Sequence, residues 1–351
     1  MLYDLALIPS KQRVAGSNPA VRAIKFLYLL IYLPKFLFMN RYEKFLDRLL
    51  KDEKILIDGA TGTEAERRGV PQLKNAWNAG GALTHPDIIK EIHSDFIKEG
   101  AEIIISNTFA TCKHLMKDAD CLDDFELINK RSVELAVEAR NDLKKNDVLV
   151  AGGISHWSFT NKLPSLNDLE EGASEQSTIM KEAGADLILL EMMIDIPRML
   201  SVLKGVKNSN LPIWVGLSCK PDDKGVMRLL SGQKDLFDSS PNLREGETLK
   251  EAISSLQGQN IPLINIMHTD VEYIEECLDI VKNNWDGLIG VYAHSGDDIQ
   301  MEWTFDQVIS PEDYLNYCEK WLKKGINIIG GCCGTGPEHI RYLRDNLILN
   351  N

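Results

Sequence analysis

The chain has 351 residues, which is long for one ordinary domain but normal for an α/β barrel with insertions. Hydrophobic residues make up 44 % and charged residues 26 %, a balance that excludes a disordered chain. The formal net charge of −13 argues against a nucleic-acid partner, because an acidic surface repels phosphates.

The first forty residues differ in composition from the rest of the chain. They carry five basic residues against a single acid, Asp4, and an apolar run over 26–33 that Pro34 ends. That run is shorter than the ~20 residues that cross a bilayer, and no small-residue cleavage site follows it. We expect residues 1–40 to be an atypical extension outside the fold, with Met39 as the true start and no stable membrane insertion. A membrane-anchoring or targeting role is the alternative.

Eight short apolar runs follow, each typical of a parallel strand that is buried on both faces. They cover residues 55–57, 103–105, 148–150, 187–190, 213–215, 263–266, 288–291 and 326–329. Amphipathic stretches lie between them, so residues 41–351 predict an α/β fold of the (β/α)8 TIM barrel class. The alternative, an open doubly wound sheet, needs a glycine-rich phosphate loop that residues 59–62 do not provide.

One helix and two loops have clear signals. Residues 86–99 predict a helix with Thr84 as its N-cap and Gly100 after its end. Residues 220–250 and 296–311 have little periodicity and follow the fifth and seventh strands. We therefore expect two long loops at the catalytic face of the barrel.

Seven cysteines at irregular spacing do not resemble a disulfide framework. They indicate a reducing compartment, and we expect a cytoplasmic protein. Most single cysteines are small buried hydrophobes, as we expect for Cys277 and Cys318.

Two adjacent cysteines carry the strongest chemical signal. Cys332 and Cys333 directly follow the eighth strand between glycines, which let the chain bend so that both sulfurs face one point. Cys219 ends the fifth strand, and three thiolates favour Zn²⁺ with a fourth position open for a substrate. The alternatives are a strained vicinal disulfide, inert buried thiols, or an iron–sulfur cluster, which usually needs a fourth cysteine.

Two acids end apolar strands at the same face. Asp58 follows the first strand and Glu191 ends the fourth, and a carboxylate there is costly without a partner. We interpret both as groups that hold a substrate ammonium; the alternatives are a helix N-cap for Asp58 and a structural ion pair for Glu191. His268 and His294 could join a metal site, although loop histidines are more often simply solvated.

Together these residues resemble the homocysteine S-methyltransferase family, over residues 55–348. The motifs are Leu56-Ile-Asp-Gly-Ala-Thr-Gly-Thr-Glu64, Ser106-Asn-Thr-Phe-Ala-Thr111, Gly216-Leu-Ser-Cys219 and Gly330-Gly-Cys-Cys-Gly-Thr-Gly-Pro-Glu-His339. The resemblance implies a barrel with one Zn²⁺ held by Cys219, Cys332 and Cys333. It implies that homocysteine's sulfur takes the open position, and we expect substrate contacts at Asp58, Gly59, Glu191 and Asn265.

Three departures from the family's patterns bear on the substrates. Ile266 follows Asn265 where similar enzymes have Asn-Cys, His294 ends a segment that is often Tyr-Pro-Asn, and Met192 replaces the tyrosine of betaine-type members. We expect a sulfonium donor, S-methylmethionine or S-adenosylmethionine, and homocysteine as acceptor. The alternatives are another thiol or selenol acceptor, or a non-catalytic relative that only binds a metabolite; the oligomeric state is left open.

Overall fold

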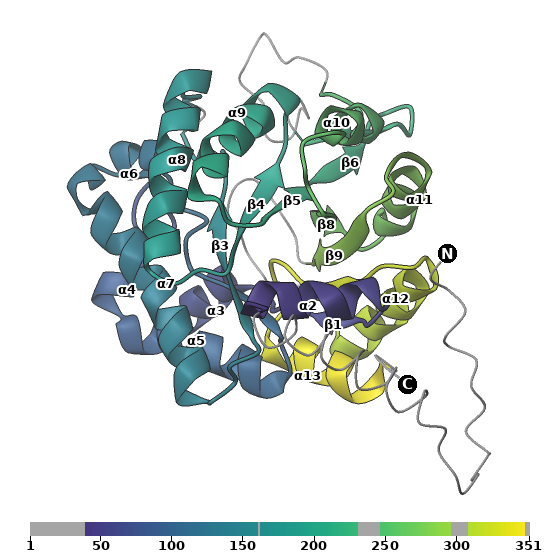
Figure 1. Cartoon of the computed structure of the whole chain (residues 1–351), viewed down its shortest axis with the longest axis horizontal. Helices are drawn as coiled ribbons and strands as arrows, with labels where there is room; N and C mark the ends of the chain where they lie inside the picture. The colour runs from purple at the N-terminus through teal and green to yellow at the C-terminus, as the bar shows by residue number, and fades with distance from the viewer. Residues whose placement is uncertain (1–38, 161, 231–245, 296–307, 348–351) are drawn as a thin grey trace, which may run out of the picture. The chain divides into compact units, whose positions relative to one another are not determined.

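The computed structural model describes residues 39–160, 162–230, 246–295 and 308–347 (Figure 1). The chain divides into two units, Met1–Lys44 and Phe45–Asn351, and the barrel lies in the second. Residues 1–38 are outside the described part, so the predicted start at Met39 and the boundary at residue 40 stay predictions. Among the described residues, no helix combines the length and the apolar character needed to cross a membrane.

Eight parallel strands form the barrel and match the eight predicted runs. They are β1 (Ile55–Leu56), β2 (Ile103–Ile105), β3 (Leu149–Ile154), β4 (Leu187–Met193), β5 (Ile213–Leu217), β8 (Leu263–Asp270), β9 (Leu288–His294) and β10 (Ile328–Gly331). Their order is β1-β10-β9-β8-β5-β4-β3-β2, and a parallel bridge between Ile57 and Ile103 joins the two ends of the sheet. The (β/α)8 prediction is confirmed, and the open-sheet alternative is wrong.

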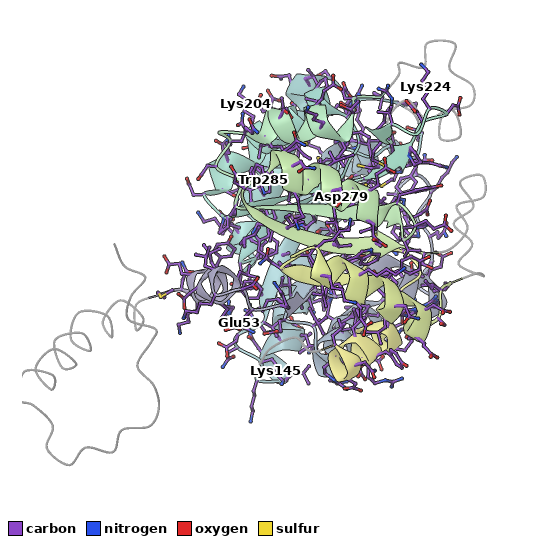
Figure 2. All side chains as sticks on the ribbon, turned by 90° about the vertical axis from the view of Figure 1, so that its right-hand side faces the viewer. Glu53, Lys145, Lys204, Lys224, Asp279 and Trp285 are labelled. Carbon is purple, nitrogen blue, oxygen red and sulfur yellow. The ribbon has the colours of Figure 1, made fainter. Side chains whose placement is uncertain are left out.

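Helices surround these strands in Figure 1. They are α2 (Arg41–Leu50), α3 (Thr61–Arg67), α4 (Gly81–Thr84), α5 (Pro86–Glu99), α6 (Lys113–Asp118), α7 (Phe125–Asp142), α8 (Leu166–Glu182), α9 (Ile196–Val206), α10 (Leu249–Leu256), α11 (Ile274–Asn284), α12 (Pro311–Lys323) and α13 (Pro337–Asn346). Lys204 of α9 and Lys145, in the loop after α7, point outward into solvent (Figure 2).

Side chains of each strand alternate between two buried layers, as strand geometry requires. In β4, Ile188 and Leu190 pack with helix residues such as Val202 in the outer layer. Leu187 and Leu189 are fully buried but take no part in that layer, so they face the barrel axis. This alternation decides which polar residues at the strand ends face the interior.

Two local predictions can be compared with the structure. Gly100 ends α5 with φ of 115°, as predicted. The N-cap prediction for Thr84 is wrong, because Thr84 is the last residue of α4 and its hydroxyl donates to the Gly80 carbonyl; His85 takes the capping position.

The predicted loop over 220–250 is partly structured. Its start forms an antiparallel hairpin of β6 (Cys219–Pro221) and β7 (Met227–Leu229), and its end belongs to α10. The prediction of an irregular loop is therefore wrong for these residues, while 231–245 lie outside the described part. Of the predicted loop 296–311, residues 296–307 also lie outside it.

Folding buries a histidine in α5 that should make stability depend on pH. His93 is fully buried, its two ring nitrogens have no partner among the described residues, and burial lowers its pKa to about 4. The unfolded chain binds this proton below about pH 6.5, so the free energy of unfolding should fall by up to about 3 kcal/mol between pH 6.5 and pH 4. Chemical denaturation of a His93→Leu variant should show a smaller fall. An unchanged slope would contradict the assignment, and His85→Leu, at a half-buried histidine, is the control.

Candidate metal centre and substrate pocket

The adjacent cysteines lie in a tight turn at the end of β10. The Cys332 N–H donates to the Ala293 carbonyl at 2.8 Å, and the N–H of Gly331 donates to the Asp58 carbonyl at 3.1 Å. Gly334 has φ of 86°, a left-handed conformation that glycine adopts without strain. Because of this turn, both thiols face the same pocket with their sulfurs 3.9 Å apart, and all seven cysteines are free. The vicinal disulfide is thus absent.

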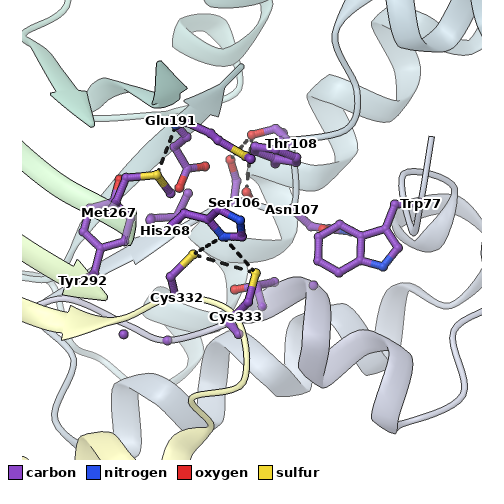
Figure 3. A pocket seen from close by; sticks show the side chains of 18 of the residues that line it. Trp77, Ser106, Asn107, Thr108, Glu191, Met267, His268, Tyr292, Cys332 and Cys333 are labelled. Carbon is purple, nitrogen blue, oxygen red and sulfur yellow. Dashed lines mark hydrogen bonds between the residues drawn. The ribbon is translucent and has the colours of Figure 1, made fainter. Parts of the chain in front are cut away.

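A histidine completes this cluster. His268 Nδ1 lies 3.7 Å from the Cys332 sulfur and 3.6 Å from the Cys333 sulfur (Figure 3). His294 lies beside it, with ring centroids 4.6 Å apart, and one ligand atom each of His268, His294 and Cys333 fall within 4.8 Å of one another. Burial, and to a smaller extent His294, lowers the pKa of His268 well below its usual range, so its ring is neutral and can bind a metal.

An irregular strand end places His268 here. In a regular strand, His268 would face away from the pocket that Met267 lines. His268 instead has φ of 43°, and the β8–β9 register shifts between Met267 and Asp270. Both side chains consequently face the pocket. In β4, Met192 also has a left-handed conformation, with φ of 52°, and lies at a register shift. Glu191 and Met192 therefore both face the pocket, although they are adjacent in the strand.

The structure does not bring Cys219 to this cluster. Ser218 donates its hydroxyl to the Met267 sulfur inside the barrel, so the next residue, Cys219, faces the outer layer. Its thiol there meets the thiol of Cys277 on α11, and it does not line the pocket. The structure therefore separates Cys219 from Cys332 and Cys333, and His268 is the side chain that lies beside the two thiols.

A pocket of about 690 Å³, counting its open mouth, covers the cluster. Its wall includes three aromatic rings and two thioethers: Trp77, Phe109, Phe159, Met192 and Met267. Of the described residues that line it, none is Lys or Arg. The pocket thus suits a cationic or neutral ligand better than an anion.

Two buried carboxyl groups lie at this site: Glu191 is in the pocket lining, and Asp58 is outside it, next to the lining residue Gly59. Glu191 lines the pocket, and burial raises its pKa to about 8. Burial also raises the pKa of Asp58 well above its usual range, and the neighbouring Glu191 adds to this, while the Ile105 N–H, which donates to Asp58 at 2.7 Å, opposes it. A side chain at Gly153 would overlap the Glu191 carboxylate, so glycine makes room for it.

The structural alternatives for these acids fail among the described residues. The N-cap of α3 is Ala60, without a side-chain cap, and Glu191 makes no ion pair there. The remaining Asp58 oxygen, Oδ1, is buried without a hydrogen bond to any described residue. An ammonium group would satisfy both carboxylates.

The other two predicted substrate residues differ in position. Gly59 lines the pocket. Asn265 is fully buried inside the barrel, next to Gly290, and does not line it. Its side-chain amide has no partner among the described residues.

Comparison with known proteins identifies the family. The family model described as Homocysteine S-methyltransferase matches residues 55–347. The chain belongs to this family.

The names of the relatives of this chain state different methyl acceptors. Homocysteine S-methyltransferase 2 of Arabidopsis thaliana is 27 % identical, over 84 % of this chain and 92 % of its own length. Selenocysteine Se-methyltransferase of Brassica oleracea var. italica is 28 % identical, over 84 % of this chain and 88 % of its own. The metallated form of the Escherichia coli homocysteine methyltransferase MmuM has the same fold, with a TM-score of 0.69, 21 % identity, and coverage of 88 % of this chain and 100 % of that one.

The position of Cys219 leads to a prediction about metal binding. A Cys219→Ala variant should bind Zn²⁺ with wild-type affinity, because its thiol faces the outer layer, although the lost packing should lower its melting temperature. A His268→Ala variant should bind at least about tenfold more weakly. Chelator competition with purified variants measures both affinities. Weaker binding in Cys219→Ala together with unchanged binding in His268→Ala would contradict this geometry.

Proposed function

We propose that this protein is a zinc-dependent S-methyltransferase that moves a methyl group from a sulfonium donor to homocysteine and so forms methionine. The observation that carries the proposal is the convergence of two thiols, one neutral imidazole and the buried Glu191 carboxyl in one pocket, with the buried Asp58 next to the lining residue Gly59. Family membership supports the acceptor class, and the pocket's lining supports the class of donor.

The donor set fits a tetrahedral Zn²⁺ ion. With Zn–S of about 2.3 Å and Zn–N of about 2.0–2.1 Å, tetrahedral ligands lie about 3.8 Å apart for two sulfurs and about 3.6 Å apart for sulfur and nitrogen. The corresponding separations among Cys332, Cys333 and His268 are 3.9, 3.7 and 3.6 Å. We therefore propose these three residues as the ligands, in place of a set that includes Cys219, with His294 close by.

The residues around the cluster explain how an acceptor thiol would react. When bound, Zn²⁺ keeps an acceptor thiol in its thiolate form at neutral pH. Asp58 and Glu191 hold the ammonium of the same molecule, which fixes the sulfur's position. The largely apolar wall of the pocket lowers the local dielectric constant, which favours a reaction in which opposite charges cancel.

The pocket wall supports a cationic donor. Trp77, Phe109 and Phe159 offer aromatic faces, which attract sulfonium and ammonium cations. The acceptor sulfur attacks the methyl carbon, forming one S–C bond, and the donor's S–C bond breaks with both electrons passing to the donor sulfur. The sulfonium thereby becomes a neutral thioether. S-methylmethionine and S-adenosylmethionine both provide this chemistry.

A selenol acceptor is the second candidate. A relative of similar identity is named as a selenocysteine Se-methyltransferase. Met192 and Met267 in the pocket wall have polarizable thioether groups, which can contact selenium as readily as sulfur. The relative rates with homocysteine and selenocysteine decide between the two acceptors.

We also propose that the protein works in the cytoplasm. Its seven cysteines are all free thiols, and the two at the site must be reduced to bind a metal.

A donor and acceptor panel tests the proposed activity. Zinc-loaded protein should form methionine from homocysteine with S-methylmethionine or S-adenosylmethionine, and betaine should give far less product. A Cys332→Ser variant should lose at least about a hundredfold in rate, because a ligand is replaced. Mass spectrometry of the product measures both. A faster reaction with selenocysteine would favour the second candidate, and ligand binding without turnover would favour a non-catalytic relative.

The raised pKa of Glu191 predicts a pH dependence of binding. Below its pKa of about 8 this carboxyl is largely protonated, and an ammonium ligand needs the carboxylate. The affinity for methionine, which has no thiol to titrate, should therefore rise about tenfold from pH 6 to pH 7. Calorimetry measures this, and Glu191→Gln should make the dependence smaller, leaving the part that comes from Asp58, whose pKa burial also raises. A wild-type affinity that is constant over this range would contradict the assigned role of Glu191.

A further inference from the structure

A threonine that lies outside the pocket lining joins the two halves of the site. We define the metal loop as residues 332–336 and the acceptor loop as residues 58–61. Thr335 is fully buried between them. Thr335 contacts Cys332 in the metal loop on one side and the acceptor loop, which carries Asp58, on the other side.

On the side of the metal loop, Thr335 closes the turn that holds the cysteines. Its N–H donates to the Cys332 carbonyl at 3.1 Å, and its hydroxyl donates to the same oxygen at 2.6 Å. This double contact fixes the peptide that carries the Cys332 thiol. A Cβ at Gly331 would overlap the Thr335 side chain, so the glycine before the cysteines leaves room for this hydroxyl.

On the side of the acceptor loop, Thr335 acts through its carbonyl. The Ala60 N–H donates to that oxygen at 2.9 Å, and a Cβ at Gly59 would lie 2.5 Å from it. The acceptor loop thus packs directly on Thr335. In the same loop, the backbone carbonyl of Asp58 accepts a hydrogen bond from the Gly331 N–H at 3.1 Å.

We propose that Thr335 is a positioning residue that sets the distance between the metal ligand Cys332 and the loop whose Asp58 carboxylate helps to hold the acceptor's ammonium. The proposal rests on the proposed function, because it assigns Thr335 to the same site. An acceptor that binds at both ends is sensitive to this distance, so one hydroxyl should affect metal affinity and acceptor affinity together.

Thr335→Val and Thr335→Ser test this role, because the first keeps the side-chain volume and the second keeps the hydroxyl. Thr335→Val should bind Zn²⁺ about tenfold more weakly in chelator competition. At saturating zinc its KM for homocysteine should rise roughly threefold or more. Thr335→Ser should stay near wild type in both measurements.

Two further variants keep the test decisive. Thr111→Val removes the three buried hydrogen bonds of this hydroxyl, none of them to the metal loop, and should lower the melting temperature without changing zinc affinity. If Thr335→Val does not fold, Thr335→Ala should reproduce its effects, because it also removes the hydroxyl that donates to the Cys332 carbonyl and inserts no atom.

A folded Thr335→Val variant with wild-type zinc affinity and KM, and only a lower melting temperature, would overturn the proposal. If the wild type binds no zinc, the proposed metal site fails instead. Homocysteine affinity measured by calorimetry then decides about Thr335, since equal affinities in wild type and Thr335→Val would still overturn its role.

Discussion

The contact between the His268 imidazole and the sulfurs of Cys332 and Cys333 depends on a strand that ends irregularly. A regular β8 would place Met267 and His268 on opposite faces, and only one of them could reach the pocket. The left-handed conformation of His268 brings both inward. Such a conformation is costly for a residue other than glycine, of order 1–3 kcal/mol, and typically persists where function requires it.

The same constraint operates on β4, which only β5 separates from β8 in the barrel. Met192 is also left-handed, and there Glu191 and Met192 both face the pocket. Glycine leaves space for the side chains that these turns direct into the pocket. Gly153, for example, leaves space for the Glu191 carboxylate. The protein thus places two thiols and the buried Glu191 carboxyl in one pocket, with the buried Asp58 next to the lining residue Gly59, an arrangement that is costly until cationic partners occupy it.

The sequence predicted the barrel because each strand is an uninterrupted apolar run between polar segments. It also predicted the position of Cys332 and Cys333, since any residue directly after a barrel strand lies at the same face. Cys219 satisfied the same rule but faces outward. Alternation along residues 213–219 groups Cys219 with Val215 and Leu217, yet alternation alone does not reveal which set faces the axis.

His268 was noted as a histidine near the site, but nothing in the sequence indicated its orientation. Its conformation follows from pairing between β8 and β9, which shifts register beyond Met267 and depends on residues far apart in the chain. The prediction of Thr84 as the N-cap of α5 is wrong for a similar reason, because Thr84 already belongs to the short helix α4. Local patterns therefore located the strands and their ends, while tertiary pairing decided which side chains meet.

X-ray absorption spectroscopy of the zinc-loaded protein tests the central claim most directly, because it counts sulfur and nitrogen neighbours of the metal. The account predicts two sulfur ligands at about 2.3 Å and at least one imidazole nitrogen at about 2.0–2.1 Å, with a third sulfur when homocysteine is added. Three sulfur ligands and no imidazole in the protein without substrate would contradict it.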